Sequence, residues 1–341
     1  MRSHSKSSTA ERSLNATGLE SFQTNAGRVP VGVVGLGLMG TSIATCLLAA
    51  GHPVVGVELD GAKRAHARRR VLAHLKQMRA EGLAKGSAPR LADRFRTSDD
   101  YSALAESQLV LESIVEDLKL KRACLHEIER SVRREAIIGS NTSAIPPSLL
   151  QRGMSYPDRV MGIHWGEPAH ITRFMEIVCG DQTKLRYARR AVALARRWGK
   201  EPSLLRRDIR GFITNRCMYA LMREAFHLVE SGYATVEDVD RSVRNDLGYW
   251  ITFAGPFRFM DLTGIPAYRA VMKDLLPDLN CSKKVPSLID RLVKSGARGV
   301  ANAKGFYRYT PRQARRWEKA FLKFSYEIRA LAQKYPEGLA G

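Results

Sequence analysis

Three glycines, Gly35, Gly37 and Gly40, are spaced as Gly-x-Gly-x-x-Gly between a short apolar run and an Ala- and Leu-rich stretch. In such a turn the first glycine permits a tight bend, the second leaves room for a pyrophosphate, and the third lets helix and strand approach closely. The N-terminus of the following helix, which contains Leu38 and Met39, would present unpaired N–H groups to phosphates. A glycine turn without a ligand is the alternative, but the preceding strand and following helix favour a dinucleotide site.

An acid follows this turn at the distance that a dinucleotide site requires. Glu58 lies 23 residues after Gly35, at the end of the apolar run 54–57. A carboxylate there accepts hydrogen bonds from the adenosine ribose and repels a 2′-phosphate, which favours NAD over NADP. Lys63 and Arg64 follow closely and could weaken that preference, and Glu58 could also be a plain surface acid. The sequence predicts NAD as the cofactor.

The elements that must position these residues alternate along the first part of the chain. Apolar runs suited to buried parallel strands alternate with helical patterns, and after Asp208 only helical patterns follow. The predicted strands are 31–34, 54–57, 109–111, 136–138, 160–164 and 174–178. The predicted helices are 38–50, 62–84, 118–132, 183–198, 218–228, 235–247, 285–295 and 311–334. This order predicts an α/β Rossmann-type doubly wound N-terminal domain followed by an all-α C-terminal domain.

The domain limits follow from the same order. We expect a Rossmann domain that binds NAD at 29–205 and a helical domain for substrate and dimerisation at 206–341. Residues 1–28 are rich in Ser, Thr, Arg and Asn and contain few apolar residues. Such a segment buries too little surface to offset the entropy of ordering, so we expect a disordered tail.

The charge is strongly positive, because 55 Lys and Arg oppose 34 Asp and Glu for a net charge of +21. Such a field favours polyanions, among them nucleic acids, nucleotide cofactors and phosphorylated substrates. Neither zinc-finger spacing nor the aromatic RNA-binding octamer occurs, so we expect no specific nucleic-acid partner. No run of 18 uncharged apolar residues occurs, so we expect no membrane span. Five scattered cysteines indicate reduced thiols in the cytoplasm and no metal site.

Further motifs are spread over both predicted domains. They are Ser140-Asn141-Thr142-Ser143, Gly162-Ile163-His164-Trp165-Gly166-Glu167-Pro168 with Glu176 twelve residues after the histidine, Arg210-Gly211-Phe212-Ile213-Thr214-Asn215-Arg216, Gly255-Pro256-Phe257 and Lys304-Gly305-Phe306-Tyr307. Together with the glycine turn, they resemble the 3-hydroxyacyl-CoA dehydrogenase family over about residues 30 to 310. That family includes dehydrogenases of small 3-hydroxy acids and of carnitine-like alcohols.

The resemblance implies a catalytic machinery. His164 would be the general base that takes the proton of the substrate 3-hydroxyl as hydride leaves C3 for the nicotinamide. Glu176 would fix the tautomer of His164 and stabilise its imidazolium. Ser143 and Asn215 would hydrogen-bond the substrate oxygen, which implies an active site between the domains. The expected cofactor contacts are Gly35, Gly37, Leu38, Met39, Gly40, Glu58, Glu116, Lys121 and Ser143.

The sequence departs from the family pattern beside the expected base. The family has His-Phe-Phe-Asn-Pro where this chain has Glu167 in place of the amide, and Pro-Gly-Phe where this chain has Arg210 before the glycine. An inward Glu167 would raise the pKa of His164 or pair with a positive substrate. The basic segment that contains Lys63 and Arg70 could hold CoA phosphates or be a solvated helix face. Lys63, Arg70, Glu167 and Arg210 are therefore the expected substrate contacts.

Four functions are candidates for these observations, and the fourth, a basic nucleic-acid binder, is supported only by the net charge. The leading one is reversible NAD-dependent oxidation of a 3-hydroxyacyl-CoA to the 3-oxo compound, in fatty acid metabolism. The second is the same chemistry on a small free 3-hydroxy acid or a carnitine-like alcohol. The third, a dinucleotide-binding protein without turnover, is opposed by the intact pair of His164 and Glu176. By resemblance we also expect a homodimer.

Overall fold

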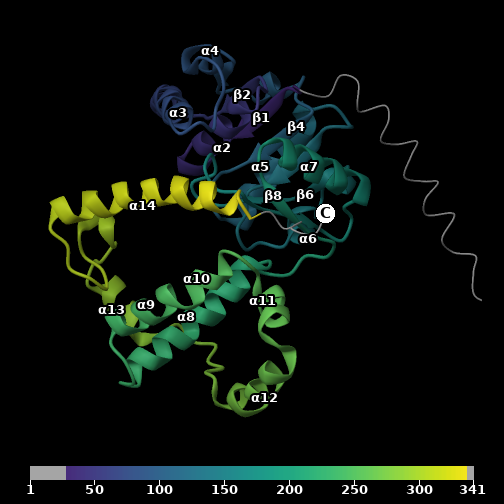
Figure 1. Ribbon diagram of the computed structural model, residues 1–341. Helices are drawn as coiled ribbons and strands as arrows, with labels where there is room; N and C mark the ends of the chain where they lie inside the picture. Colours follow the sequence, from purple (N-terminus) through teal and green to yellow (C-terminus); the bar gives the residue numbers. More distant parts are fainter. Residues whose placement is uncertain (1–27, 336–341) are drawn as a thin grey trace, which may run out of the picture. The chain divides into compact units, whose positions relative to one another are not determined.

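The computed structural model describes residues 28–335, which form two compact units that meet in sequence between Phe212 and Ile213 (Figure 1). The first unit is a mostly parallel sheet with helices, and the second is helical. The predicted fold class is thereby confirmed. The predicted disordered tail lies outside the described residues except for Arg28.

The first unit is built on one sheet of eight strands in the order β3-β2-β1-β4-β5-β6-β7-β8. The strands are β1 (Val31–Val34), β2 (Val54–Val57), β3 (Phe95–Ser98), β4 (Leu109–Glu112), β5 (Ile137–Ser140), β6 (Val160–Trp165), β7 (Phe174–Cys179) and β8 (Glu201–Leu205). All neighbours are parallel except β6 and β7. The first six strands follow the order of a doubly wound dinucleotide fold, whose ligand binds where the order reverses beside β1.

Helices cover both faces of this sheet. They are α2 (Leu38–Ala49), α3 (Gly61–Ala80), α4 (Ala88–Ala92), α5 (Leu118–Ser131), α6 (Pro147–Leu150) and α7 (Leu185–Arg197), with the short 3-10 turns η2 (Tyr101–Leu104) and η3 (Pro157–Arg159). Successive strand side chains point to opposite faces. Val33 therefore joins the core formed with α2, α3 and α7, whereas Val34 joins the core formed with α5 and α6. Both faces are buried, which explains the near-continuous apolar runs.

The sequence prediction missed two strands, β3 and β8, which are the two edges of the sheet. β3 contains the exposed Arg96, and β8 starts at the exposed Glu201 and continues with Pro202. An edge strand tolerates polar residues and a proline, because one side of its backbone has no neighbouring strand to pair with. The apolar run by which the central strands were recognised is therefore absent from both.

The second unit consists of α8 (Thr214–Glu230), α9 (Val236–Asn245), α10 (Leu247–Ile251), α11 (Pro256–Thr263), α12 (Ile265–Leu275), α13 (Ser287–Lys294) and α14 (Pro311–Ala332), with the short turns η4 (Leu276–Asp278) and η5 (Val300–Asn302). A capping box between Thr310 and Gln313 starts α14, which satisfies two backbone donors at that end. In α8 to α13 every described side chain is at least partly exposed. Within residues 28–335 no helix has the length and apolarity to cross a membrane.

Candidate active site

The glycine turn between β1 and α2 has the shape that a pyrophosphate needs. Gly35 has a φ of +88°, in the region that favours glycine. A Cβ on Gly40 would lie 1.8 Å from the carbonyl oxygen of Gly35, whereas a Cβ on Gly37 would meet nothing within 4 Å. Gly40 is thus required by packing within the protein, and Gly37 leaves open space in front of the N-terminus of α2. The residues present fit a dinucleotide.

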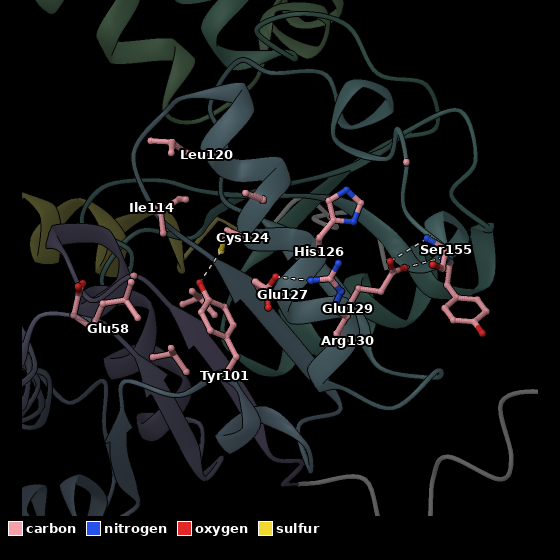
Figure 2. A pocket seen from close by; sticks show the side chains of 17 residues that line it. Glu58, Tyr101, Ile114, Leu120, Cys124, His126, Glu127, Glu129, Arg130 and Ser155 are labelled. Carbon is pink, nitrogen blue, oxygen red and sulfur yellow. Dashed lines mark hydrogen bonds and ion pairs between the residues drawn. The ribbon is translucent and has the colours of Figure 1, made fainter.

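Glu58 stands at the carboxyl end of β2, beside this turn. Its Oε2 accepts a hydrogen bond from the N–H of Leu36 at 3.2 Å, and its Oε1 accepts one from the N–H of Asp60 at 3.3 Å. A cavity of about 1050 Å³ opens here, and Figure 2 shows Glu58 and Tyr101 on one side of it and Ser155 on the other. One end of the cavity, at Gly35, Glu58 and Ile114, lies where the strand order reverses, as expected for the nucleotide of a doubly wound fold, and the cavity continues from there along α5.

His164 and Glu176 form the expected pair. They are directly opposite in the antiparallel register of β6 and β7, and Nδ1 of His164 lies 2.8 Å from Oε2 of Glu176. The Glu176 side chain is 1% exposed and that of His164 is 10% exposed. A buried carboxylate accepts the proton of Nδ1, so Nε2 carries the imidazole lone pair. The His164 ring also packs edge-on against Phe174, with ring centroids 5.3 Å apart.

The Ser143 loop is tied to the strand that carries His164. Oδ1 of Asn141 accepts a hydrogen bond from the backbone N–H of Trp165 at 2.9 Å. Oε1 of Glu116 accepts hydrogen bonds from the Thr142 hydroxyl at 2.5 Å and from the N–H of Ser143 at 3.0 Å. Asn141 and Glu116 therefore fix the loop from two sides, and the Ser143 side chain is exposed at its tip.

A buried ionic network of Glu112 and Lys121 contacts the carboxylate of Glu116. Nζ of Lys121 lies 2.8 Å from Oε1 of Glu112 and 3.3 Å from Oε2 of Glu116, and the side chains of Lys121 and Glu112 are 1% and 0% exposed. Ser140 donates to the same Glu112 carboxylate at 2.5 Å. Burial raises the pKa of Glu116, but the hydrogen bond from Thr142 and the charge of Lys121 outweigh it and lower that pKa. Glu116 is thus held as a carboxylate under the Ser143 loop.

Comparison with known proteins decides the family. The family model described as 3-hydroxyacyl-CoA dehydrogenase, NAD binding domain, matches residues 30–209, and the model of the family's C-terminal domain matches residues 211–309. The chain belongs to the 3-hydroxyacyl-CoA dehydrogenase family. The family predicted from the motifs is confirmed, and so is NAD as the cofactor of this dehydrogenase.

The relatives of this family member act on different substrates, as their names state. A 5-formyl-3-hydroxy-2-methylpyridine 4-carboxylate 5-dehydrogenase of Mesorhizobium japonicum is 32% identical, over 84% of this chain and 92% of its own. An L-carnitine dehydrogenase of Oceanobacillus iheyensis is 31% identical over 75% and 82%. A 3-hydroxybutyryl-CoA dehydrogenase of Mycobacterium tuberculosis is 30% identical over 82% and 98%.

A solved structure of a pyridine dehydrogenase, described as an NAD⁺-dependent dismutase of 5-formyl-3-hydroxy-2-methylpyridine 4-carboxylic acid, superposes with a TM-score of 0.84. It is 29% identical, and the match covers 90% of this chain and 99% of that one. A solved 3-hydroxybutyryl-CoA dehydrogenase from Ralstonia eutropha superposes with a TM-score of 0.68, covering 82% of this chain and 99% of that one, at 28% identity. The fold of this family member is therefore shared by enzymes named for both kinds of substrate.

The remaining predicted residues of this 3-hydroxyacyl-CoA dehydrogenase family member lie as follows. Glu167 and Arg210 are exposed, as is Lys63 on α3, and Arg70 of the same helix is partly buried. Asn215 lies in the first turn of α8, in the second unit. Its hydrogen bond to the substrate stays a prediction.

The sequence alone did not reveal how the segment after His164 is fixed. Nδ1 of His170 lies 2.7 Å from Oγ of Ser42 on α2, 128 residues away along the chain. Lys200 donates hydrogen bonds to the carbonyls of Ala169 and Thr172, and its Nζ lies 5.0 Å from the centre of a Trp165 ring. No local pattern marks such contacts, because each joins segments that only the fold brings together.

Phe212 is a further residue that sequence analysis assigned to a motif without a role. It is 1% exposed, and its ring centroid lies 5.8 Å from that of His164. Its φ of +52° is unusual for a non-glycine residue. The backbone N–H of Gly211 donates to the carbonyl of Ala144 at 3.2 Å. The segment 210–212 therefore runs past both the Ser143 loop and the histidine, which places the backbone of Arg210 close to them.

Proposed function

We propose that this chain oxidises an alcohol carbon to a carbonyl, with His164 as the general base. The supporting observation is the 2.8 Å contact between Nδ1 of His164 and Glu176. With that contact made, Nε2 takes the hydroxyl proton, the C–H bond breaks, and a carbonyl forms. Bound NAD supplies the hydride acceptor for this reaction. Glu176 stabilises the imidazolium until its proton passes to solvent.

The neighbouring polar residues receive roles in this proposal. Ser143 donates a hydrogen bond to the substrate oxygen and holds it toward Nε2 of His164. Glu116 and Lys121 support the Ser143 loop and border the nicotinamide side of the cofactor. The predicted division between residues 205 and 206 assigns NAD binding to the first part of the chain and substrate binding and dimerisation to the second, whereas the compact units divide between Phe212 and Ile213.

For the substrate we propose a small carboxylated molecule. The match to the relative named for a pyridine carboxylate covers 92% of that relative. The solved structure of an enzyme named for the same pyridine carboxylate superposes with a TM-score of 0.84. This chain also carries Arg210 two residues before Phe212, whose ring packs on His164. A guanidinium there pairs with a substrate carboxylate in a bidentate way. Glu167, which is exposed and lies three residues after His164, disfavours a second negative group on the substrate.

A 3-hydroxyacyl-CoA is the second candidate, and the surface of α3 favours it. Lys63, Arg68 and Arg69 are exposed on that helix, and Arg70 is partly exposed. Guanidinium and ammonium groups bind the phosphates of CoA. The chain is also 30% identical to an enzyme named for 3-hydroxybutyryl-CoA.

A substrate panel tests both candidates. NADH formation is followed with 3-hydroxybutyryl-CoA, free 3-hydroxybutyrate, carnitine and aromatic carboxylates that bear a hydroxymethyl or formyl group. Turnover of the free acids with a KM that rises in Arg210→Met supports the small substrate, and turnover of the thioester alone supports acyl-CoA. If no compound reacts while NADH still binds, the chain is a dinucleotide-binding protein without turnover.

We also propose a homodimer through the second unit. Large apolar side chains are exposed on its helices: Tyr219, Tyr249, Phe257, Leu262, Ile265, Val271, Trp317, Phe321 and Phe324. Apolar surface on this scale is typical of an interface. Sedimentation velocity at micromolar concentration should give twice the mass of the 38.1 kDa chain. A monomer under those conditions excludes the dimer.

A further inference from the structure

The surface just beyond Glu58 has three basic features that would suit a phosphate. The N-terminus of the 20-residue helix α3 begins at Gly61, and Lys63 and Arg64 lie in its first turn. A helix N-terminus with adjacent cations attracts anions. In a dinucleotide site of this fold, the 2′-phosphate of NADP would come to this place. Groups that could bind a 2′-phosphate therefore lie beside a site whose cofactor, NAD, has none.

The guanidinium of Arg64 is held beside Glu58 by the backbone. Its Nη1 donates to the carbonyl oxygen of Glu58 at 2.6 Å and to that of Leu59 at 3.0 Å. These bonds place the guanidinium at the residue whose carboxylate we assign to the ribose. They do not depend on any charged partner, so Arg64 has a fixed position at the carboxyl end of β2.

A carboxylate from the neighbouring strand neutralises this guanidinium. Asp99 follows β3, which pairs with β2, and its Oδ2 lies 2.9 Å from Nη2 of Arg64. The Arg64 side chain is 22% exposed and that of Asp99 is 65% exposed. The pair is therefore open to solvent on the Asp99 side, where an incoming phosphate would compete with it.

A second carboxylate occupies the helix end itself. Oδ1 of Asp60 accepts hydrogen bonds from the N–H groups of Ala62 and Lys63 at 2.8 Å and 3.1 Å. These are N–H groups that a phosphate at this helix end would use. With Glu58, three carboxylates thus oppose a 2′-phosphate: one directly, one by capping α3, and one by pairing with Arg64.

We propose that Asp99 is a specificity-determining residue that keeps this dehydrogenase selective for NAD. It withholds from a 2′-phosphate a guanidinium that already lies at Glu58. The proposal rests on the proposed placement of the adenosine ribose at Glu58. It assigns a role to a residue outside the glycine turn and its following acid, 35 residues along the chain from the arginine that it neutralises.

The test measures the Kd of NADH and of NADPH by fluorescence titration at low ionic strength, without any substrate. In Asp99→Asn the affinity for NADPH should rise about fivefold, because Arg64 loses its exposed ion pair with Asp99 and can pair with the 2′-phosphate instead. The Kd of NADH, which has no 2′-phosphate, should change less than twofold. Asp100→Asn is the matched control. It removes the same charge at the next residue, but its carboxylate bonds to Ser102. In this control the affinity for NADPH should rise much less.

The variant Arg64→Met separates the mechanism from a general change of charge. In the double variant Asp99→Asn/Arg64→Met, the gain in NADPH affinity should disappear. A gain that survives without Arg64, or one that Asp100→Asn reproduces in full, overturns the proposal.

The variant Glu58→Gln separates the placement of the ribose at Glu58 from the role of Asp99. If it weakens NADH and strengthens NADPH while Asp99→Asn changes neither, the ribose lies at Glu58 and the role of Asp99 is wrong. If Glu58→Gln leaves both affinities unchanged, the placement of the ribose is wrong and the proposal falls with it. The proposed chemistry at His164 is unaffected by either result, because no turnover is measured.

Discussion

His164 and Glu176 are direct cross-strand neighbours, and the antiparallel register of β6 and β7 alone brings Nδ1 of one within 2.8 Å of Oε2 of the other. Side chains directly opposite on one face of such a pair lie about 5 Å apart at Cβ. A contact fixed by sheet register needs no flexible loop to assemble it. The proposed base is thus oriented before any substrate binds.

Replacement of either residue should reduce turnover without loss of cofactor binding. We expect His164→Gln and Glu176→Gln each to lower kcat by about 10²- to 10⁴-fold, since one removes the base and the other its orientation. The double variant should be little worse than His164→Gln, because the two residues act as a unit. Steady-state rates and NADH titrations measure both effects. Full activity in His164→Gln would refute the assignment of the base.

Gly37 and Gly40 should respond in opposite ways to the same added methyl group. Gly40→Ala places Cβ 1.8 Å from the Gly35 carbonyl oxygen, so we expect a large loss of thermal stability. Gly37→Ala meets nothing within 4 Å and should keep its Tm, but its Cβ enters the space assigned to the pyrophosphate and should weaken NADH binding at least about tenfold. Thermal melts and NADH titration separate the two. Equal NADH affinity in Gly37→Ala would place the cofactor elsewhere.

Lys121 should matter for stability as well as for the cofactor site. Lys121→Ala leaves the fully buried carboxylate of Glu112 without its ion-pair partner, which we expect to cost about 3–5 kcal/mol in the free energy of unfolding. Lys119→Ala, on the exposed face of the same helix, should change it by less than about 0.5 kcal/mol. Chemical denaturation measures both values. Similar small losses in the two variants would show that the buried pair is not needed for folding.

The protein should lose stability on acidification because of two stacked histidines. The rings of His74 and His170 lie 4.3 Å apart. Burial, with the charge of Arg70, lowers the pKa of His74 to about 4. Burial, with His74, Lys200 and Arg70, lowers the pKa of His170 to about 3. As the pH falls, the unfolded chain therefore takes up protons on these two histidines at a higher pH than the folded protein does.

Both groups contribute stability that is complete above the ordinary histidine value of 6.5 and is lost as the pH falls toward 4. We expect a loss of at most about 1.4 kcal/mol per pH unit from each histidine. We measure the free energy of unfolding by urea titration at several pH values between 7 and 5. This free energy should fall less steeply with falling pH in His170→Asn than in the wild type. His66→Asn, which alters an exposed histidine on α3, should keep the wild-type slope. An unchanged slope in His170→Asn would contradict the assignment.

Much of this protein was determined by local sequence. The glycine turn, the acid after β2 and the apolar central strands are each recognisable from residue types within a few positions, because buried parallel strands and phosphate-binding turns impose strict local demands. The edge strands β3 and β8 escaped prediction because an edge imposes no such demand. Glu176 was anticipated from the family pattern, and its contact with His164 follows from the register.

The tertiary structure alone decided which distant polar groups meet. Asn141 holds the backbone of Trp165, Ser42 holds His170, and Asp99 neutralises Arg64. Each of these contacts depends on which strands are neighbours and on how adjacent helices pack, and neither is encoded in residue spacing. Charge and hydrogen bonding act over a few ångströms in space. A sequence that predicts the elements correctly therefore still leaves their polar partners to the fold.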